Sequence, residues 1–191
     1  RETHHVETCN NLGYARSRDL KHWVTAAGEP VKLPITLEDK GTIIDPVPVN
    51  GGLHNSNHHL GFDSDGRPVV SYFKHDAEGN TQAYVARFEG GAWRIRQVSD
   101  WQGRHIFKGG GSGPSTFGTS LSVRGVTRLA EGKLAVPFRH WKAGSGRLVI
   151  DEDTLAFIEV APRAAARAPR YPKALTKVTS DFRGMGVRWS G

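Results

Sequence analysis

Short apolar runs alternate with turn-forming residues along most of the chain, which is the pattern of short β-strands rather than of helices. In the middle of the chain, strands are predicted over residues 54–62, 68–75, 81–88 and 93–98. The first connection, Asp63-Ser-Asp-Gly66, supplies residues that tolerate a positive φ angle. Four consecutive strands joined by tight turns predict an antiparallel sheet of the kind that forms one propeller blade. No helix is predicted.

The chain also repeats itself, which indicates more than one such sheet. The segment Tyr14–Trp23 aligns without gaps with Tyr84–Trp93, and Gly66–Tyr72 aligns with Gly132–Phe138. Each member of the second pair begins with a turn glycine and a base and ends in an aromatic residue. The offsets of 70 and 66 residues exceed the roughly 40–50 residues of a usual blade because loops intervene.

We therefore predict an all-β fold made of propeller blades of four antiparallel strands. The chain is divided into the outer half of a blade (1–27), a connecting loop (28–53), a blade (54–101), a Gly-rich loop (102–119), a second blade (120–160), a linker (161–173) and the start of the next blade (174–191). Two whole and two partial blades cannot close a ring, and an open ring leaves strand edges unpaired. We expect a piece of a six- or seven-bladed propeller, seven being the favoured number, or a chain that needs the remaining blades as partners.

Composition narrows the class of protein. The 191 residues are 37% hydrophobic and carry a net charge of +7, and no apolar run approaches the roughly 20 residues of a membrane-spanning helix. A single cysteine, Cys9, excludes an internal disulfide and a Cys-paired zinc site. Residues 163–191 hold seven basic side chains and one acidic one, but the prolines and alanines between them favour an extended connector over a nucleic-acid site. Neither a nucleic acid nor a membrane is expected as a partner.

Candidate chemistry concentrates in the histidine-rich segment 51–59 and in His75. Antiparallel pairing of the predicted strands places His54 and His75 at the same end of the blade, where propeller pockets open. Strand alternation would put His54, Ser56 and His58 on one face. Two imidazoles that titrate near neutrality can share acid and base work. Two alternatives stay open, namely hydrogen-bonded structural histidines and a metal site with nitrogens from His54, His58 and His75.

The second blade offers further candidates. Its strand ends in Arg139 and His140, and a guanidinium beside imidazoles suits a carboxylate because arginine presents a planar fork of donors. Arg104 and His105 are further candidates to line the binding pocket, and they lie next to the glycine run 109–113 in the sequence. That run lacks the strand–loop–helix context of a phosphate-binding loop.

The segment Ser17–Trp23 resembles the Asp-box of sialidase-like propellers, with Lys21 in place of the glycine of that motif. Its aspartate, Asp19, is expected to cap a turn by accepting backbone N–H bonds, and Trp23 is expected to pack between blades. We expect a structural role here and no chemistry.

Taken together, several segments resemble the BNR-4 group of propeller proteins: Gly52–Asn55, Gly61–Asp63, Asp65–Arg67, His75-Asp76, Gly79–Gln82, Ser99–Trp101 and Phe107–Gly111. Members of that family are seven-bladed propellers that cut acidic polysaccharides, among them ulvan lyases and the lyases and rhamnosidases acting at rhamnose–glucuronate links. The resemblance implies an acidic polysaccharide or oligosaccharide as partner and a secreted or periplasmic location. No cofactor is expected, although a structural calcium or zinc ion remains open.

In the lyases of this family, two histidines and an arginine form the site, and His54, His75 and Arg139 match them by position. The resemblance implies β-elimination, in which Arg139, helped by Asn55, neutralises a uronate carboxylate and a histidine removes the C5 proton. The residues expected to bind substrate are Asn55, His58, Arg104, His105 and His140. Where those lyases carry a tyrosine, this chain has the segment 122–124, Ser-Val-Arg, so a rhamnosidase-like hydrolase or a non-catalytic glycan-binding propeller remains an alternative.

Overall fold

Antiparallel β-strands build the fold of the chain. The computed structural model describes residues 8–54, 57–106 and 119–163. Within these ranges the helical structure is a single 3-10 turn, η1 (Lys40–Thr42), and no helix is long and apolar enough to cross a membrane. The predicted all-β class is confirmed.

The first large sheet has four strands in the order β6-β7-β8-β9. Their bounds are β6 (His59–Phe62), β7 (Pro68–His75), β8 (Thr81–Glu89) and β9 (Ala92–Gln97). The last three agree with the predicted strands to within a residue at each end. The turn before β7 closes as expected, because Gly66 has a φ of 75° and donates its N–H to the Asp63 carbonyl.

The prediction was wrong for the beginning of the first strand, which starts at His59 and not at His54. Gly52 has a φ of 83°, and the Asn57 N–H donates to the carbonyl oxygen of His54, so the chain bends here instead of extending. The expected alternation of His54 and His58 on one strand face therefore does not apply. His54 is buried, whereas His58 is exposed.

The second large sheet occupies the stretch predicted as the second blade. Its order is β10-β12-β13-β14, and the short strand β11 also pairs with β12. The bounds are β10 (Leu121–Val123), β11 (Thr127–Arg128), β12 (Lys133–His140), β13 (Gly144–Asp151) and β14 (Phe157–Ala161). Because β10 and β11 both lie along β12, they act as two pieces of one interrupted edge strand. Four-stranded antiparallel sheets of this kind are those of propeller blades.

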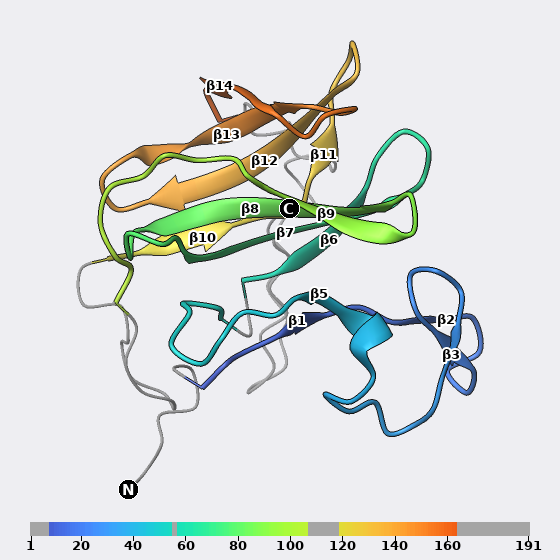
Figure 1. Cartoon of the computed structure of the whole chain (residues 1–191). Helices are drawn as coiled ribbons and strands as arrows, with labels where there is room; N and C mark the ends of the chain where they lie inside the picture. The colour runs from blue at the N-terminus through green and yellow to red at the C-terminus, as the bar shows by residue number, and fades with distance from the viewer. Residues whose placement is uncertain (1–7, 55–56, 107–118, 164–191) are drawn as a thin grey trace, which may run out of the picture.

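The two sheets stack face to face, with β12–β14 above β7–β9 in Figure 1. Alternate residues of β7 and β12 point into the interface, as the period of two in a strand requires. The buried cluster between the sheets includes Val69, Phe73, Val85, Trp101, Val123, Leu134, Val136, Phe138, Leu148 and Ile150. This cluster is the larger of the two buried clusters. Its packing determines how the strand ends of the two sheets lie relative to each other.

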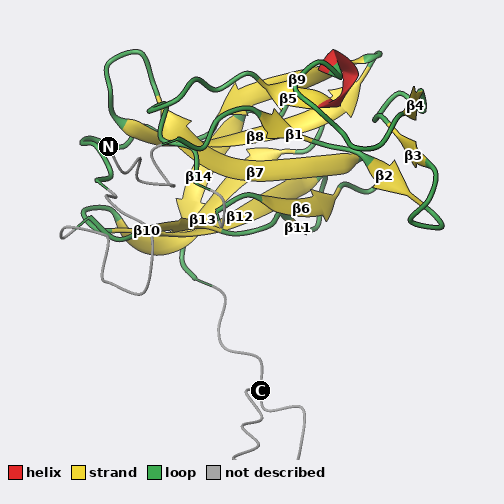
Figure 2. Ribbon diagram, turned by 90° about the horizontal axis from the view of Figure 1, so that it is seen from below, coloured by secondary structure: helices red, strands yellow, loops and turns green. Residues whose placement is uncertain are grey.

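The other face of the first sheet is covered by the N-terminal part of the chain. The pair β1 (Leu12–Gly13) and β5 (Ile43–Asp45) lies on it, and a second cluster forms from Leu12, Ile44, Val47, Leu53, Val70, Tyr72, Tyr84 and Ala86. A small separate sheet, β2 (Arg16–Ser17), β3 (Trp23–Val24) and β4 (Pro30–Val31), lies to one side (Figure 2). The stretch 28–53, expected to be a connecting loop, thus contains two short strands. β4 pairs with β3 in the small sheet, and β5 contributes Ile44 to the cluster that covers the first sheet.

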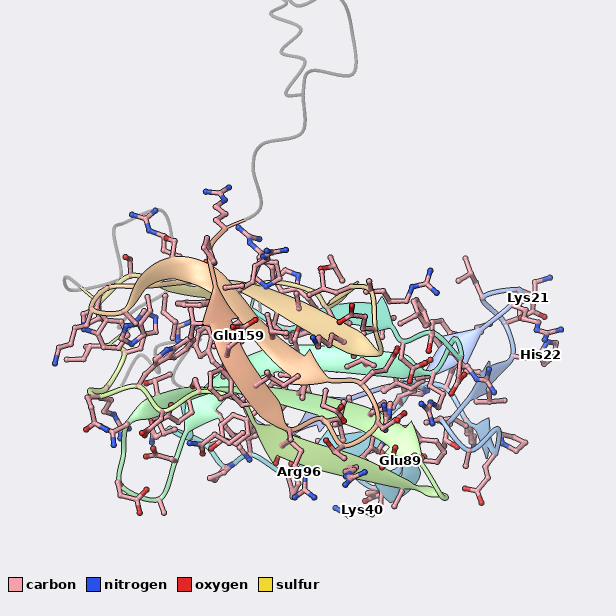
Figure 3. All side chains as sticks on the ribbon, turned by 90° about the horizontal axis from the view of Figure 1, so that it is seen from above. Lys21, His22, Lys40, Glu89, Arg96 and Glu159 are labelled. Carbon is pink, nitrogen blue, oxygen red and sulfur yellow. The ribbon has the colours of Figure 1, made fainter. Side chains whose placement is uncertain are left out.

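The Asp-box-like hairpin has the structural role expected for its aspartate. Asp19 accepts backbone N–H bonds from Lys21 at 2.9 Å and His22 at 2.8 Å, and Figure 3 shows Lys21 and His22 at the periphery of the molecule. Trp23 does not pack between sheets as expected. It is half-buried, and its indole N–H donates to the Leu20 carbonyl within the same hairpin.

Several predicted parts lie outside the described residues. They are the centre of the Gly-rich loop (107–118), nearly all of the linker and the start of the next blade (164–191), and Asn55. Those parts of the predicted division stay predictions.

Candidate functional site

Four histidines gather where the two stacked sheets end. His54 precedes β6, His75 ends β7, His105 follows β9, and His140 ends β12. Three come from the first sheet and its loops and one from the second. The site therefore depends on the packing of the two sheets against each other.

His54 and His105 form the buried centre of this histidine cluster. Their ring centroids are 5.1 Å apart, and both rings contact Phe73, at 5.0 Å for His54 and 5.6 Å for His105. Only 7% of His54 and 5% of His105 is exposed. Phe73 of β7 thus packs against both imidazole rings.

His75 lies beside this pair and is held from two sides. Its Nδ1 atom lies 2.9 Å from the hydroxyl oxygen of Thr81, the residue opposite it in the β7–β8 ladder. One face of the ring lies against Gly52, where an added Cβ atom would come within 2.6 Å of the ring atoms Cε1 and Nε2. The positive charge of Arg104 contributes to lowering the pKa of His75. The Arg104 guanidinium donates a hydrogen bond to the Asn50 carbonyl oxygen at 3.3 Å.

His140 is enclosed by two tryptophans, with centroid distances of 3.8 Å to Trp141 and 4.7 Å to Trp101. Its Nδ1 atom accepts backbone N–H bonds from Lys142 at 3.1 Å and Ala143 at 3.0 Å. Trp141 also approaches His105, at 6.0 Å. A continuous row of rings therefore joins His140 to the centre of the cluster.

The electrostatics of the cluster keep its imidazoles neutral. Burial, followed by the proximity of other histidines, lowers the pKa of His54 to about 4. The pKa values of His75 and His140 are also lowered to about 4, first by burial and then by Arg104 and Lys142 respectively. Burial lowers the pKa of His105 as well. At neutral pH each ring is thus uncharged, with one donor and one acceptor nitrogen. The expectation that His54 and His75 titrate near neutrality is wrong, because burial holds their pKa values well below that range.

Arg139 is not part of the histidine cluster. It is exposed and lies on the face of β12 opposite to that of its buried neighbour His140. Its cross-strand partners are Ser122 and Ser145. The expectation of a guanidinium beside the imidazoles was therefore wrong for Arg139, and the arginine that lies there is Arg104. His58 is exposed too, and its Nδ1 atom contacts the His54 carbonyl at 3.3 Å.

The alternative of a metal site formed by His54, His58 and His75 is not supported by the positions of these side chains. In the ranges that the structure describes, no three histidine, cysteine or carboxylate side chains are grouped so that they could hold a metal ion. The chemistry available to the described cluster is acid–base catalysis and hydrogen bonding by neutral imidazoles, with a guanidinium beside them.

Two members of this site were missed at the level of sequence. Thr81 contacts His75, and Phe73 supports His54 and His105. The signal for Thr81 was present, since a hairpin turn over residues 76–80 places residues 75 and 81 opposite each other. Phe73 could have been placed on the same strand face as His75 by alternation.

Comparison with protein families gives a match over residues 1–101 to the family described as "BNR repeat-containing family member". The chain belongs to this BNR repeat family. The matched region contains His54, His75 and Thr81, and the second sheet lies beyond it. The family prediction made from the sequence is confirmed.

Curated protein sequences give no match to this BNR repeat chain. Among solved structures, it is similar to one titled as a new family of polysaccharide lyase, a PL25 ulvan lyase, and to another titled as that lyase bound to -[GlcA(1-4)Rha3S]-. In both cases the identity is 16% and the TM-score 0.39, with 73% of this chain and 30% of the other chain covered. The chain thus spans about a third of the length of that lyase.

Proposed function

We propose that this BNR repeat protein acts on an acidic polysaccharide or oligosaccharide at the histidine cluster and cleaves it beside a uronate by β-elimination. The observation that supports this most directly is the pair of neutral imidazoles, His54 and His75, with Arg104 next to them. A location outside the cytoplasm, secreted or periplasmic, is part of the proposal because such glycans are extracellular polymers.

Arg104 supplies the carboxylate-binding group in this proposal. A guanidinium binds a carboxylate through two parallel N–H bonds and withdraws charge from it. Neutralising the carboxylate makes the proton on the adjacent C5 atom more acidic. Arg104 is exposed, so an incoming uronate can reach it.

The reaction then needs one base and one acid. A neutral imidazole takes the C5 proton, the electrons of the C5–H bond form a C4=C5 double bond, and the bond between C4 and the glycosidic oxygen breaks. The departing oxygen receives a proton from a second group, so atoms and charge balance without an external reactant. Positioned acid–base groups contribute about 10²–10⁴-fold to such a step.

One observation favours a second function of the same site. Val123, the middle residue of the segment 122–124 that stands where the lyases of this family carry a tyrosine, is 0% exposed and packs in the cluster between the two sheets. No phenol can donate a proton from there. Either a histidine protonates the leaving oxygen, or the protein is a glycoside hydrolase of the rhamnosidase type acting on rhamnose–glucuronate links.

The deciding experiment is digestion of ulvan and of a glucuronate-capped arabinogalactan by the full-length protein, with a His54→Ala variant in parallel. We expect ultraviolet absorbance from an unsaturated uronate, lost in the variant. Free rhamnose without that absorbance would replace the lyase by the hydrolase. Binding of both glycans without either product would leave a non-catalytic glycan-binding propeller and overturn the proposed enzyme.

A further inference from the structure

Thr81 is the polar centre of the contacts around His75. The residue is 0% exposed. Its backbone N–H donates to the Gly103 carbonyl at 3.0 Å, and its hydroxyl oxygen accepts the backbone N–H of His105 at 2.8 Å. The same hydroxyl lies 2.9 Å from Nδ1 of His75. One side chain thus joins the end of β7 to the loop that carries Arg104 and His105.

These contacts determine which way the hydrogen bond to His75 runs. A hydroxyl has one hydrogen to donate, and within the described ranges the hydroxyl of Thr81 has two partners, the His105 N–H and His75 Nδ1. The N–H is itself a donor and cannot accept that hydrogen. His75 Nδ1 is therefore the acceptor that remains, and a buried hydroxyl hydrogen without an acceptor would lose its hydration with nothing in return.

We infer that Thr81 is a positioning residue that holds His75 as a neutral imidazole whose proton is on Nε2. The hydrogen bond made by one ring nitrogen sets the protonation of the other. His75 then presents an N–H donor at its free edge and has no lone pair there to accept a proton. The structure contains a second example, since Nδ1 of His140 accepts two backbone N–H bonds.

The inference divides the roles of the two histidines, a consequence that rests on the proposed function. If His75 carries its proton on Nε2, it donates a hydrogen bond or a proton to a glycan oxygen. The proton acceptor of the elimination is then His54. Because Gly52 packs on the face of the His75 ring, the backbone also restricts the plane in which that donor points.

The direct test is made on the wild-type protein, and a substitution is needed only to assign the signals. Nitrogen-15 NMR of the full-length protein labelled at histidine shows which ring nitrogen carries hydrogen, and His75→Gln identifies the His75 signals. We expect a protonated Nε2 and a hydrogen-bonded, unprotonated Nδ1 at neutral pH. A proton on Nδ1 would make Thr81 the acceptor and would overturn the inference.

Variants of Thr81 then distinguish a role in positioning His75 from a contribution to the stability of the protein alone. Thr81→Val keeps the shape of the side chain without the hydroxyl, and Thr81→Ser restores the hydroxyl. Thr119→Val is the matched control, because its hydroxyl binds the backbone of Ile106 in the same loop but does not contact His75. In Thr81→Val we expect the His75 Nδ1 signal to move to that of a free acceptor and turnover of ulvan to fall up to about 10²-fold.

Thr81→Ser is expected to recover both the Nδ1 signal and turnover, and Thr119→Val to change neither. An unchanged His75 signal in Thr81→Val, or equal losses in Thr81→Val and Thr119→Val, would refute a positioning role. The NMR result is independent of catalysis. If ulvan is not cleaved but Nε2 carries the proton, the proposed function fails and the inference about Thr81 stands.

Discussion

The guanidinium of Arg87, on β8 of the first sheet, donates a hydrogen bond to the backbone carbonyl oxygen of Glu152, in the turn after β13 of the second sheet. Arg87 is 1% exposed and forms ion pairs with Asp63 and Glu89. The Glu152 carboxylate in turn accepts the backbone N–H of Ser64 at 2.6 Å. This buried polar contact joins the two sheets at the end opposite the histidine cluster.

Replacing Arg87 with methionine should destabilise the protein strongly. Asp63 would lose one of its cationic partners while still buried, and removing one partner of a buried ion pair typically costs about 3–5 kcal/mol. The free energy of unfolding from urea titration measures the loss. The control is Arg94→Met, which removes a half-buried partner of the same Glu89 and should cost less than about 1 kcal/mol. Equal losses in the two variants would contradict the role assigned to Arg87.

Gly52→Ala should disturb His75 selectively. Gly52 has a φ of 83°, and a Cβ atom there would lie 2.6 Å from the His75 ring. Gly66 has a φ of 75° but open space around it, so Gly66→Ala isolates the backbone cost of about 1–2 kcal/mol. We expect Gly52→Ala to cost more and to change the NMR signals of His75. Matching losses of stability with unchanged His75 signals would show that the ring can move aside freely.

The strands and turns of the first sheet were predictable because local chemistry specifies them. The residues of β7 and β8 are apolar runs bounded by Asp-Gly and Gly-Asn turns, and the structure places both strands where the sequence did. The segment 54–58 has no apolar alternation to hold it in a sheet. The positive φ angle of Gly52 and the burial of the His54 ring set the backbone path up to His54, and that burial depends on a contact distant in sequence.

The site was only partly predictable for a related reason. Alternation shows that Arg139 and His140 lie on opposite faces of one strand, but it does not say which face meets the neighbouring sheet. Only the stacking of the sheets shows that His140 faces the histidine cluster and Arg139 does not. The grouping of His54, His75 and His105 likewise comes from the loop after β9, whose path no local pattern specifies.

Stability should fall as the solution becomes more acidic. His54 and His140 have pKa values of about 4 in the folded state against 6.5 for an unperturbed histidine, so the unfolded chain binds more protons between these limits. The free energy of unfolding therefore decreases as the pH falls from 6.5 to about 4, by at most about 1.4 kcal/mol per pH unit for each histidine. Urea titrations across this range measure the slope. His54→Gln should flatten it, and an unchanged slope in that variant would show that His54 is not held neutral.

Arg104 and Arg139 are the two arginines considered for binding the uronate carboxylate, and substitution of each one tests which of them does so. Both are exposed, but only Arg104 lies close enough to lower the pKa of His75. If the uronate binds beside the imidazoles, Arg104→Ala should lower turnover of ulvan about 10²-fold, the cost of removing one group that stabilises developing negative charge. Arg139→Ala should lose much less, because its side chain lies on the other face of β12. Initial rates of formation of unsaturated product measure both variants. A greater loss in Arg139→Ala would move the carboxylate to the far face of the second sheet and away from the histidine cluster.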